Sequence, residues 1–209
     1  MDNDIISAAV AIAGTYLIGS FPTAYIVGRL RKGIDIRKVG TRNMGAMNAI
    51  YSLGIVYGLI VLIVDIAKGI AAVFLARWLE VGFIIQLAAG GTAIIGHIFP
   101  VFLSFRGGKG GAVCIGVLAA LMPMAAPFGT GIFLIVLLAT RFPTLSYSLA
   151  LCCVPFVAWL IYHSGVLVLF SVIMLLILLA GYVPRIREMR TTGGSWHRVL
   201  VRRNLKDRF

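Results

Sequence analysis

A glycine-rich basic loop between two apolar runs is the stretch of this sequence best suited to chemistry. The loop reads Arg106-Gly107-Gly108-Lys109-Gly110-Gly111; an apolar run carrying His97 precedes it and another follows from Ala112. Glycines leave backbone N–H groups uncovered and permit turns with positive φ. The two basic side chains add charge, and a helix starting near Ala112 directs its N-terminal dipole to the same place. The loop predicts a site for an anion, most naturally phosphate. A short basic turn between membrane helices is the alternative.

Two further polar loops could contribute to such a site. The first, residues 33–48, holds three glycines, two asparagines, a threonine hydroxyl and three basic side chains. The second, residues 140–146, holds two threonines and a serine. If all three loops gather on one face of the molecule, binding and catalysis belong there.

Charged and titratable side chains inside the apolar runs form a second group of candidates. Asp65 and Lys68 are three residues apart, so they share one face of a helix. Charges at membrane depth are expensive and usually face the interior of a bundle or a polar cavity. The pair is either a self-paired structural couple or part of a substrate site. His97 is either a buried histidine bonded to a neighbouring carbonyl or a site residue beneath the glycine loop.

The acidic residues and the remaining motifs argue against other chemistries. Only seven Asp and Glu occur, and they are too scattered for a two-metal site. The sequence offers no Cys/His cluster for zinc and no confident Ser-His-Asp triad. We therefore predict neither metal nor cofactor, and a site suited to one substrate with a phosphate and another with an acyl chain.

The elements that must position these residues are transmembrane helices. The chain has 209 residues, 60% hydrophobic and only 12% charged, against about 25% charged in a soluble domain. A span needs roughly 20 apolar residues, and seven candidates are present. They cover residues 5–28, 50–78, 82–104, 111–123, 125–140, 145–162 and 165–183. We predict an all-α integral membrane protein, a bundle of about seven transmembrane helices.

The distribution of basic residues supports this count and predicts an orientation. The formal net charge is +12. With seven crossings, seventeen of the nineteen Lys and Arg residues fall on the C-terminal side of the membrane. The positive-inside rule makes that side cytoplasmic and puts the N-terminus outside. We predict a transmembrane domain over 1–184 and a basic cytoplasmic tail over 185–209, with membrane lipids rather than nucleic acid as partners.

Four motifs, in order along the chain, resemble those of a known family. They are Gly19-Ser20-Phe21-Pro22, the stretch 40–48, Asp65-Ile66-Ala67-Lys68-Gly69, and the stretch 96–102 with Gly107-Gly108-Lys109-Gly110. Together they resemble the bacterial acyl-phosphate:glycerol-3-phosphate acyltransferases (the PlsY family). The resemblance implies a multi-pass enzyme of the bacterial inner membrane with a cytoplasmic active site. It implies acyl transfer from acyl phosphate to the 1-hydroxyl of glycerol 3-phosphate, giving lysophosphatidic acid and phosphate for phospholipid synthesis.

The same resemblance nominates site residues by matching position. Those expected to be catalytic are Thr41, Asn43, His97, Lys109 and Thr144. Those expected to bind substrate are Arg42, Gly45, Asn48, Lys68, Arg106, Gly107, Gly108 and Gly110. A non-catalytic lipid-binding protein, or a transporter of a phosphate ester, is the alternative use of such a scaffold. A transporter favours inverted repeats, and the sequence shows no internal repeat.

The sequence departs from the family pattern in its loops and in its tail. Thr41 replaces a serine, Arg42 a glycine, Met47 a threonine, and Thr144 another serine. After the last span the family's His-Arg-x-Asn is absent, and a His197-Arg198 pair occurs later in the chain. One hypothesis is that this pair folds back under the bundle to replace the missing motif; the other is that the tail only grips anionic lipid.

Overall fold

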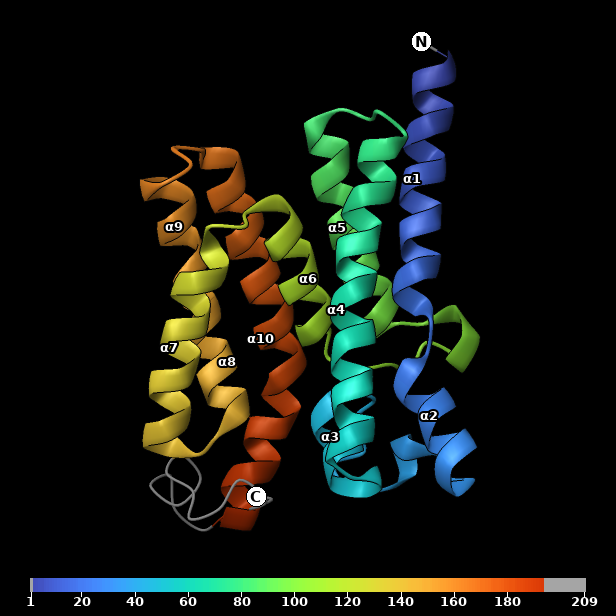
Figure 1. The fold of residues 1–209 in the computed structure, drawn as a ribbon, viewed down its shortest axis with the longest axis vertical. Helices are drawn as coiled ribbons and strands as arrows, with labels where there is room; N and C mark the ends of the chain where they lie inside the picture. Colours follow the sequence, from blue (N-terminus) through green and yellow to red (C-terminus); the bar gives the residue numbers. More distant parts are fainter. Residues whose placement is uncertain (1, 194–209) are drawn as a thin grey trace. The chain divides into compact units, whose positions relative to one another are not determined.

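The computed structural model describes residues 2–193, which form helices joined by turns and loops (Figure 1). The chain divides into two compact units, one comprising Met1–Leu121 and the other starting at Met122. Across the described residues the predicted all-α class is confirmed.

The first unit contains six α-helices and two short 3₁₀ helices within the described residues. They are α1 (Asp2–Ser20), α2 (Thr23–Lys32), η1 (Ile36–Lys38), α3 (Ala46–Leu53), α4 (Ile55–Trp78), α5 (Phe83–Ile98), η2 (Val101–Leu103) and α6 (Gly111–Leu121). Helix α1 packs on α5, α4 packs on α6, and α4 also contacts α1, α3 and α5. Helix α4 is therefore the centre of this unit.

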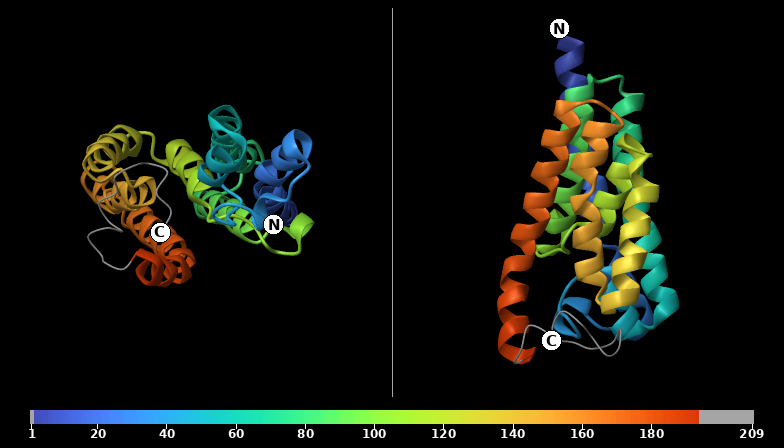
Figure 2. Two further views of the ribbon diagram at one scale, coloured as in Figure 1. Left: turned by 90° about the horizontal axis from the view of Figure 1, so that it is seen from below. Right: turned by 90° about the vertical axis from the view of Figure 1, so that its left-hand side faces the viewer.

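The described part of the second unit contains α7 (Ala125–Thr140), α8 (Pro143–Cys152), α9 (Val154–Leu160) and α10 (Gly165–Gly193). Helices α7 and α8 pack on each other, and α9 packs on α10, as the views in Figures 1 and 2 agree. Proline occupies the first turn of both α8 and α9. Its fixed φ suits a helix start, and its missing N–H costs no hydrogen bond there.

Several helix boundaries differ from the predicted spans for identifiable reasons. The run 5–28 is split after Ser20, because Pro22 supplies no N–H for a continuous helix. The run 50–78 is split at Gly54, which has a φ of 109°. The last helix continues to Gly193, so the first part of the predicted tail is helical.

Paired glycines let helices of the first unit approach closely. A Cβ on Gly19 of α1 would collide with the backbone of Ala93 on α5, and one on Gly96 of α5 with the Tyr16 carbonyl on α1. Gly69 of α4 and Gly116 of α6 face each other's backbones in the same way. Small residues at such contacts are typical of helices that associate in a membrane.

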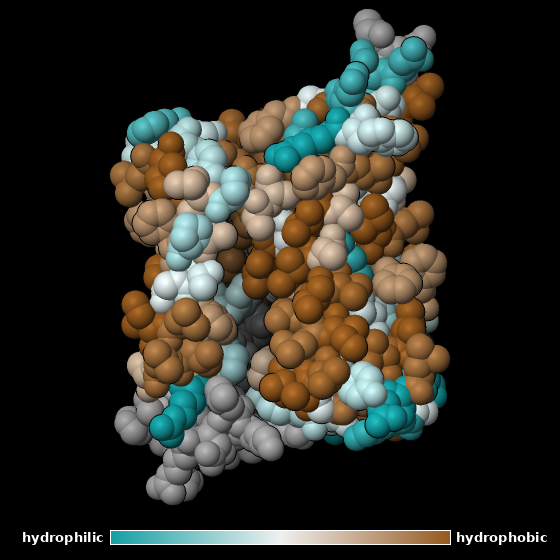
Figure 3. Space-filling view, viewed as in Figure 1, coloured by the Kyte–Doolittle hydropathy of each residue, from teal (hydrophilic) through white to brown (hydrophobic). Residues whose placement is uncertain are grey.

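The lengths and surfaces of the helices suit a membrane. Three described segments are long and apolar enough to cross it, Asn3–Lys32, Ile55–Trp78 and Phe83–Leu103, and four shorter apolar helices occur in the rest of the described chain. On the first unit, hydrophobic side chains cover the face over α4, with hydrophilic residues toward its two ends (Figure 3). The exposed apolar residues on this helix include Ile55, Leu59, Ile63 and Phe74. The count of seven crossings stays a prediction.

Candidate active site

A buried cluster of polar side chains lies where α1, α2, α4 and α5 meet. Asp65 and Lys68 of α4 are 1% and 6% exposed, and Lys68 Nζ lies 2.7 Å from Asp65 Oδ1. Thr23 Oγ1 donates to the same carboxylate oxygen at 3.0 Å, and the ammonium also donates to the Phe21 carbonyl. The couple is thus internally paired. Two of the three ammonium hydrogens of Lys68 are directed to protein oxygens, which favours a structural role; the predicted contact of Lys68 with substrate stays a prediction.

His97, in the last turn of α5, joins this cluster to the glycine loop. The imidazole is 3% exposed, and its Nδ1 lies 4.0 Å from Asp65 Oδ1. Among the described residues no group hydrogen-bonds to Nδ1. The Nε2 edge lies directly under Gly108, where a Cβ would collide with it. This position, behind the loop, favours His97 as a support for it rather than as a group that touches substrate.

The glycine loop differs from the predicted anion site, in which its backbone N–H groups were expected to be uncovered. The N–H groups of Gly107 and Gly108 donate to the carbonyls of Ile98 and His97, both at 3.0 Å, so neither is open to an anion. Of the loop's described glycines only Gly110 has a positive φ, 78°. At Gly107 and Gly108 glycine is needed for a different reason: neighbouring atoms lie so close to the backbone that a Cβ on either residue would collide with them. The turn before them runs through Ser104 and Phe105, both left-handed at φ 54° and 60°.

The polar loop of residues 33–48, called loop one from here on, is organised from within by Asn48. This side chain is fully buried, and its Nδ2 donates to the carbonyls of Ile36, Val39 and Asn43 at 2.9–3.1 Å. Its Oδ1 accepts the backbone N–H of Thr41 at 2.8 Å. These contacts occupy the amide's donors. The geometry therefore favours Asn48 as the residue that fixes the loop, and a direct contact of Asn48 with substrate stays a prediction.

The structure brings loop one and the glycine loop together in the first unit. A Cβ on Gly108 would lie 2.9 Å from the Met44 carbonyl, and Arg37 Nη1 donates to the Leu103 carbonyl at 3.2 Å. Arg42 and Arg106 are exposed, while Thr41, Asn43, Gly45 and Lys109 are half-buried. The backbones of the two loops thus meet at Gly108 and Met44, and the neighbouring hydroxyl, amide and cationic residues are at least partly exposed.

The remaining candidates belong to other parts of the chain. Thr144 is the second residue of α8 in the second unit. His197 and Arg198 lie outside the described residues. Thr23 and Arg37 are not among the residues predicted from the sequence. Thr23 follows a proline at a helix start and carries no distinguishing signal, and Arg37 was counted only as one of many basic loop residues.

Architecture and site together define a helical membrane protein in which two glycine-containing, cationic loops meet above a buried ion pair. Comparison with known proteins then identifies the family. The profile described as glycerol-3-phosphate acyltransferase matches residues 9–192. The chain is 46% identical to glycerol-3-phosphate acyltransferase 2 of Dehalococcoides mccartyi, across 99% of this chain and all of that protein. It is 36% identical to the glycerol-3-phosphate acyltransferase of Geotalea daltonii, across 88% and 95% of the two chains. The chain belongs to the glycerol-3-phosphate acyltransferase family.

Solved structures agree. The crystal structure of PlsY, an integral membrane glycerol 3-phosphate acyltransferase, in its glycerol 3-phosphate form matches with a TM-score of 0.82 and 27% identity, over 89% of this chain and 93% of that one. Its lysophosphatidic acid form matches with a TM-score of 0.80 and 26% identity, over the same shares. The predicted resemblance, the enzyme class and the integral membrane character are confirmed.

Proposed function

We propose that this acyltransferase takes its acyl group from acyl phosphate and delivers it to the 1-hydroxyl of glycerol 3-phosphate. The observation that carries the proposal is the meeting of loop one and the glycine loop at Gly108, beside Met44 and His97. Membership of the family, and relatives solved with glycerol 3-phosphate and with lysophosphatidic acid, support the acceptor and the product.

The reaction requires little covalent chemistry from the protein. The hydroxyl oxygen of glycerol 3-phosphate attacks the acyl carbon and forms an ester bond. The bond from that carbon to the phosphate oxygen breaks, and inorganic phosphate leaves. The hydroxyl proton passes to a phosphate oxygen of a substrate, so no strong side-chain base is needed. Positioning and charge stabilisation are then the protein's main contributions.

The two loops divide these tasks. Arg42, Arg106 and Lys109 offset the repulsion between two phosphates, and their side-chain cations replace the glycine N–H groups that the fold uses internally. Thr41 and Asn43 orient the acceptor by hydrogen bonds. Thr144, nominated by its matching position in the sequence, is proposed as a further catalytic hydroxyl.

Other residues shape and support the two loops. Gly45, Gly107, Gly108 and Gly110 allow close backbone approach, with Asn48 fixing loop one. His97, supported by Asp65 and Lys68, underlies the glycine loop.

The same proposal sets the protein in the bacterial inner membrane with seven crossings, an outer N-terminus and a cytoplasmic C-terminus. Its support is the concentration of Lys and Arg in the loops that this count gathers on one side. The predicted division into a transmembrane domain over 1–184 and a basic tail over 185–209 is part of this proposal.

One assay tests the donor and the acceptor together. Purified protein in detergent is given acyl phosphate and glycerol 3-phosphate, and release of inorganic phosphate is followed with formation of lysophosphatidic acid. We expect equal amounts of both products. Acyl coenzyme A and acyl carrier protein, offered in place of acyl phosphate, are expected to give none. Transfer from either of these, with none from acyl phosphate, contradicts the proposed donor.

A further inference from the structure

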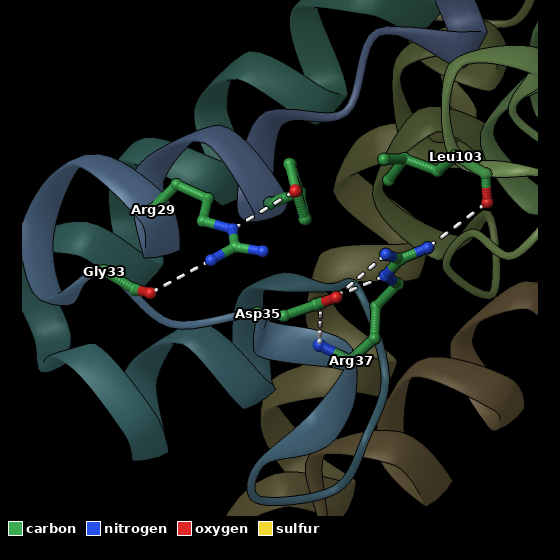
Figure 4. Close-up of polar contacts among 6 residues, drawn as sticks. Arg29, Gly33, Asp35, Arg37 and Leu103 are labelled. Carbon is green, nitrogen blue, oxygen red and sulfur yellow. Dashed lines mark hydrogen bonds and ion pairs between the residues drawn. The ribbon is translucent and has the colours of Figure 1, made fainter.

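Arg37 makes contacts in three directions from the short helix η1. Its Nε and Nη2 donate to the Asp35 carboxylate at 3.0 and 2.8 Å, a two-point ion pair. Its guanidinium lies 5.2 Å from the centre of the Tyr25 ring on α2. Its Nη1 crosses to the carbonyl of Leu103, at the end of η2 (Figure 4). One side chain thus joins α2, loop one and the segment that leads into the glycine loop.

The charge of Arg37 is already balanced within the protein. The Asp35 side chain is only 8% exposed and also accepts the backbone N–H of Arg37 at 3.0 Å. The hydrogen bond from Arg37 holds the pKa of Asp35 below its ordinary value, and the carboxylate in turn raises the pKa of Arg37. Three of the five N–H donors of this guanidinium are directed to protein oxygens, and its charge is paired, so it is poorly placed to bind a substrate phosphate as its main partner.

We propose that Arg37 is a positioning residue that, oriented by Asp35, straps loop one to the base of the glycine loop and so sets the spacing between the two groups of phosphate-binding residues. This assignment rests on the proposed function of those loops. The strap joins Arg37 to the Leu103 carbonyl; Arg37 lies seven residues before Met44, and Leu103 lies five residues before Gly108. It is therefore a second link between the loops, separate from that contact.

The neighbouring Arg29 provides a matched control. Its guanidinium also lies over the Tyr25 ring, at 5.3 Å, but its hydrogen bonds go to the Tyr25 hydroxyl and the Gly33 carbonyl, both at 3.1 Å. These bonds stay within α2 and the residue that follows it, and none of them reaches the glycine loop (Figure 4). The two arginines share an environment and differ in the link that the proposal requires.

The first test is kinetic. Arg37→Lys keeps the charge but cannot bridge a carboxylate and a distant carbonyl with a planar fork. We expect it to lower kcat/KM for glycerol 3-phosphate by roughly tenfold or more, the usual effect of losing a charge-assisted hydrogen bond. Arg29→Lys is expected to stay within about twofold, as for an exposed pair. Equal activities of the two variants overturn the proposal.

The direction of the Asp35→Asn effect separates a strap from a substrate ligand. If Arg37 acts as a strap, Asp35→Asn loosens it, lowers kcat/KM, and adds little to the loss in Arg37→Lys because the two residues act as one unit. If Arg37 binds the substrate phosphate directly, Asp35→Asn frees a guanidinium and lowers KM. A lowered KM, or additive losses in the double variant, overturns the proposal.

A measurement without substrate distinguishes failure of the strap from failure of the proposed function. Amide hydrogen exchange of the peptide spanning 99–111 is compared in wild type, Arg37→Gln and Arg29→Gln. We expect faster exchange of this peptide only in Arg37→Gln. Unchanged exchange in that variant contradicts the strap, whether or not the protein uses acyl phosphate. Faster exchange in a protein inactive with acyl phosphate contradicts only the proposed donor.

Discussion

At the scale of single residues, the site depends on close packing around Gly108, where no atom larger than a hydrogen fits in place of its side chain. Gly108 separates the imidazole of His97 from the carbonyl of Met44, and its backbone N–H is bonded to the carbonyl of His97 itself. His97 is held in turn near Asp65, which Thr23 and Lys68 keep in place. A phosphate that contacts the glycine loop therefore rests on a layer of packed, buried polar groups.

The first prediction concerns Gly108→Ala. Its Cβ would lie 2.9 Å from the Met44 carbonyl and closer still to His97 Nε2, and overpacking of this kind costs about 1–3 kcal/mol. We expect a loss of more than tenfold in turnover, measured as phosphate release. Gly82→Ala is the control, because nothing lies within 4 Å of its Cβ position and its φ is −58°. Similar activities of the two variants contradict the packed arrangement.

The second prediction concerns Lys109→Ala. A charge-assisted hydrogen bond to a phosphate contributes about 1.5–3 kcal/mol, so we expect roughly a 10- to 150-fold loss of kcat/KM for glycerol 3-phosphate or for the donor. Lys38→Ala, an exposed lysine on η1, is the control and should retain activity. Near-normal turnover of Lys109→Ala would instead support the alternative interpretation, in which the loop is a basic turn between membrane helices without a catalytic role.

At the scale of elements, loop one is a folded unit rather than a flexible connection. The buried amide of Asn48 gathers three carbonyls and one N–H from residues 36–43 around itself. The 3₁₀ helix η1 is capped by the Asp35 side chain at one end of this loop. Residues that are meant to orient a small substrate are thereby fixed before it arrives, which lowers the entropy cost of binding.

The third prediction tests this arrangement with Asn48→Asp. A carboxylate there faces three carbonyl oxygens without a donor to offer them. We expect it to lower the free energy of unfolding by about 3 kcal/mol or more, measured by thermal unfolding in detergent. Asn3→Asp, on the exposed first turn of α1, should change stability little. An equally stable Asn48→Asp protein contradicts the internal bonding of the loop.

The fourth prediction concerns pH. The Arg37 side chain, with smaller help from its backbone N–H and from the charge of Arg29, holds the pKa of Asp35 below 3.8 against the opposing effect of burial. The stabilisation is thus complete above pH 3.8 and is lost as the pH falls through the lowered pKa. We expect Asp35→Asn to lower the free energy of unfolding by about 1 kcal/mol at neutral pH.

This difference from wild type should shrink as the pH drops below the native-state pKa. In an Arg37→Gln background, Asp35→Asn should have little effect at either pH. A difference that persists unchanged under strongly acidic conditions contradicts the assignment.

At the scale of the whole molecule, the helices combine a membrane-facing surface with a site built at their ends. In the first unit the polar cluster lies where α1 and α5 end, against Asp65 and Lys68 in the middle of α4, and the exposed sides of α4 are apolar. An enzyme that joins a polar acceptor to an acyl chain has to work at such a boundary.

The fifth prediction is the topology. In a background without native cysteines, a cysteine at Asp2 or Glu80 should react with an impermeant thiol reagent added outside cells. One at Lys38 or Arg187 should react only after the membrane is opened. Labelling of Lys38 from outside overturns the proposed orientation.

Local sequence signals predicted the helices well and their contacts poorly. Apolar runs located α7 within residues 125–140, as observed, and the pairing of Asp65 with Lys68 followed from their spacing along one helix. The glycine loop was recognised by composition, but the partners of its N–H groups were not. Those partners, Ile98 and His97, follow from the path of the chain after α5. The link from Arg37 to Leu103 joins residues 66 apart in the sequence, beyond the reach of any periodicity.

The reciprocal glycines between α1 and α5, and between α4 and α6, also constrain how such a protein can change. At each crossing one helix presents a bare backbone to the backbone of its neighbour, so a larger residue on either side pushes the whole helix away. A single replacement of one of these glycines by a larger residue should therefore impair the protein. A second substitution on the facing helix could restore function by making room for the larger side chain. A genetic screen starting from Gly69→Ala should then recover suppressors on α6, around Val113 to Val117, rather than in the loops that carry the chemistry.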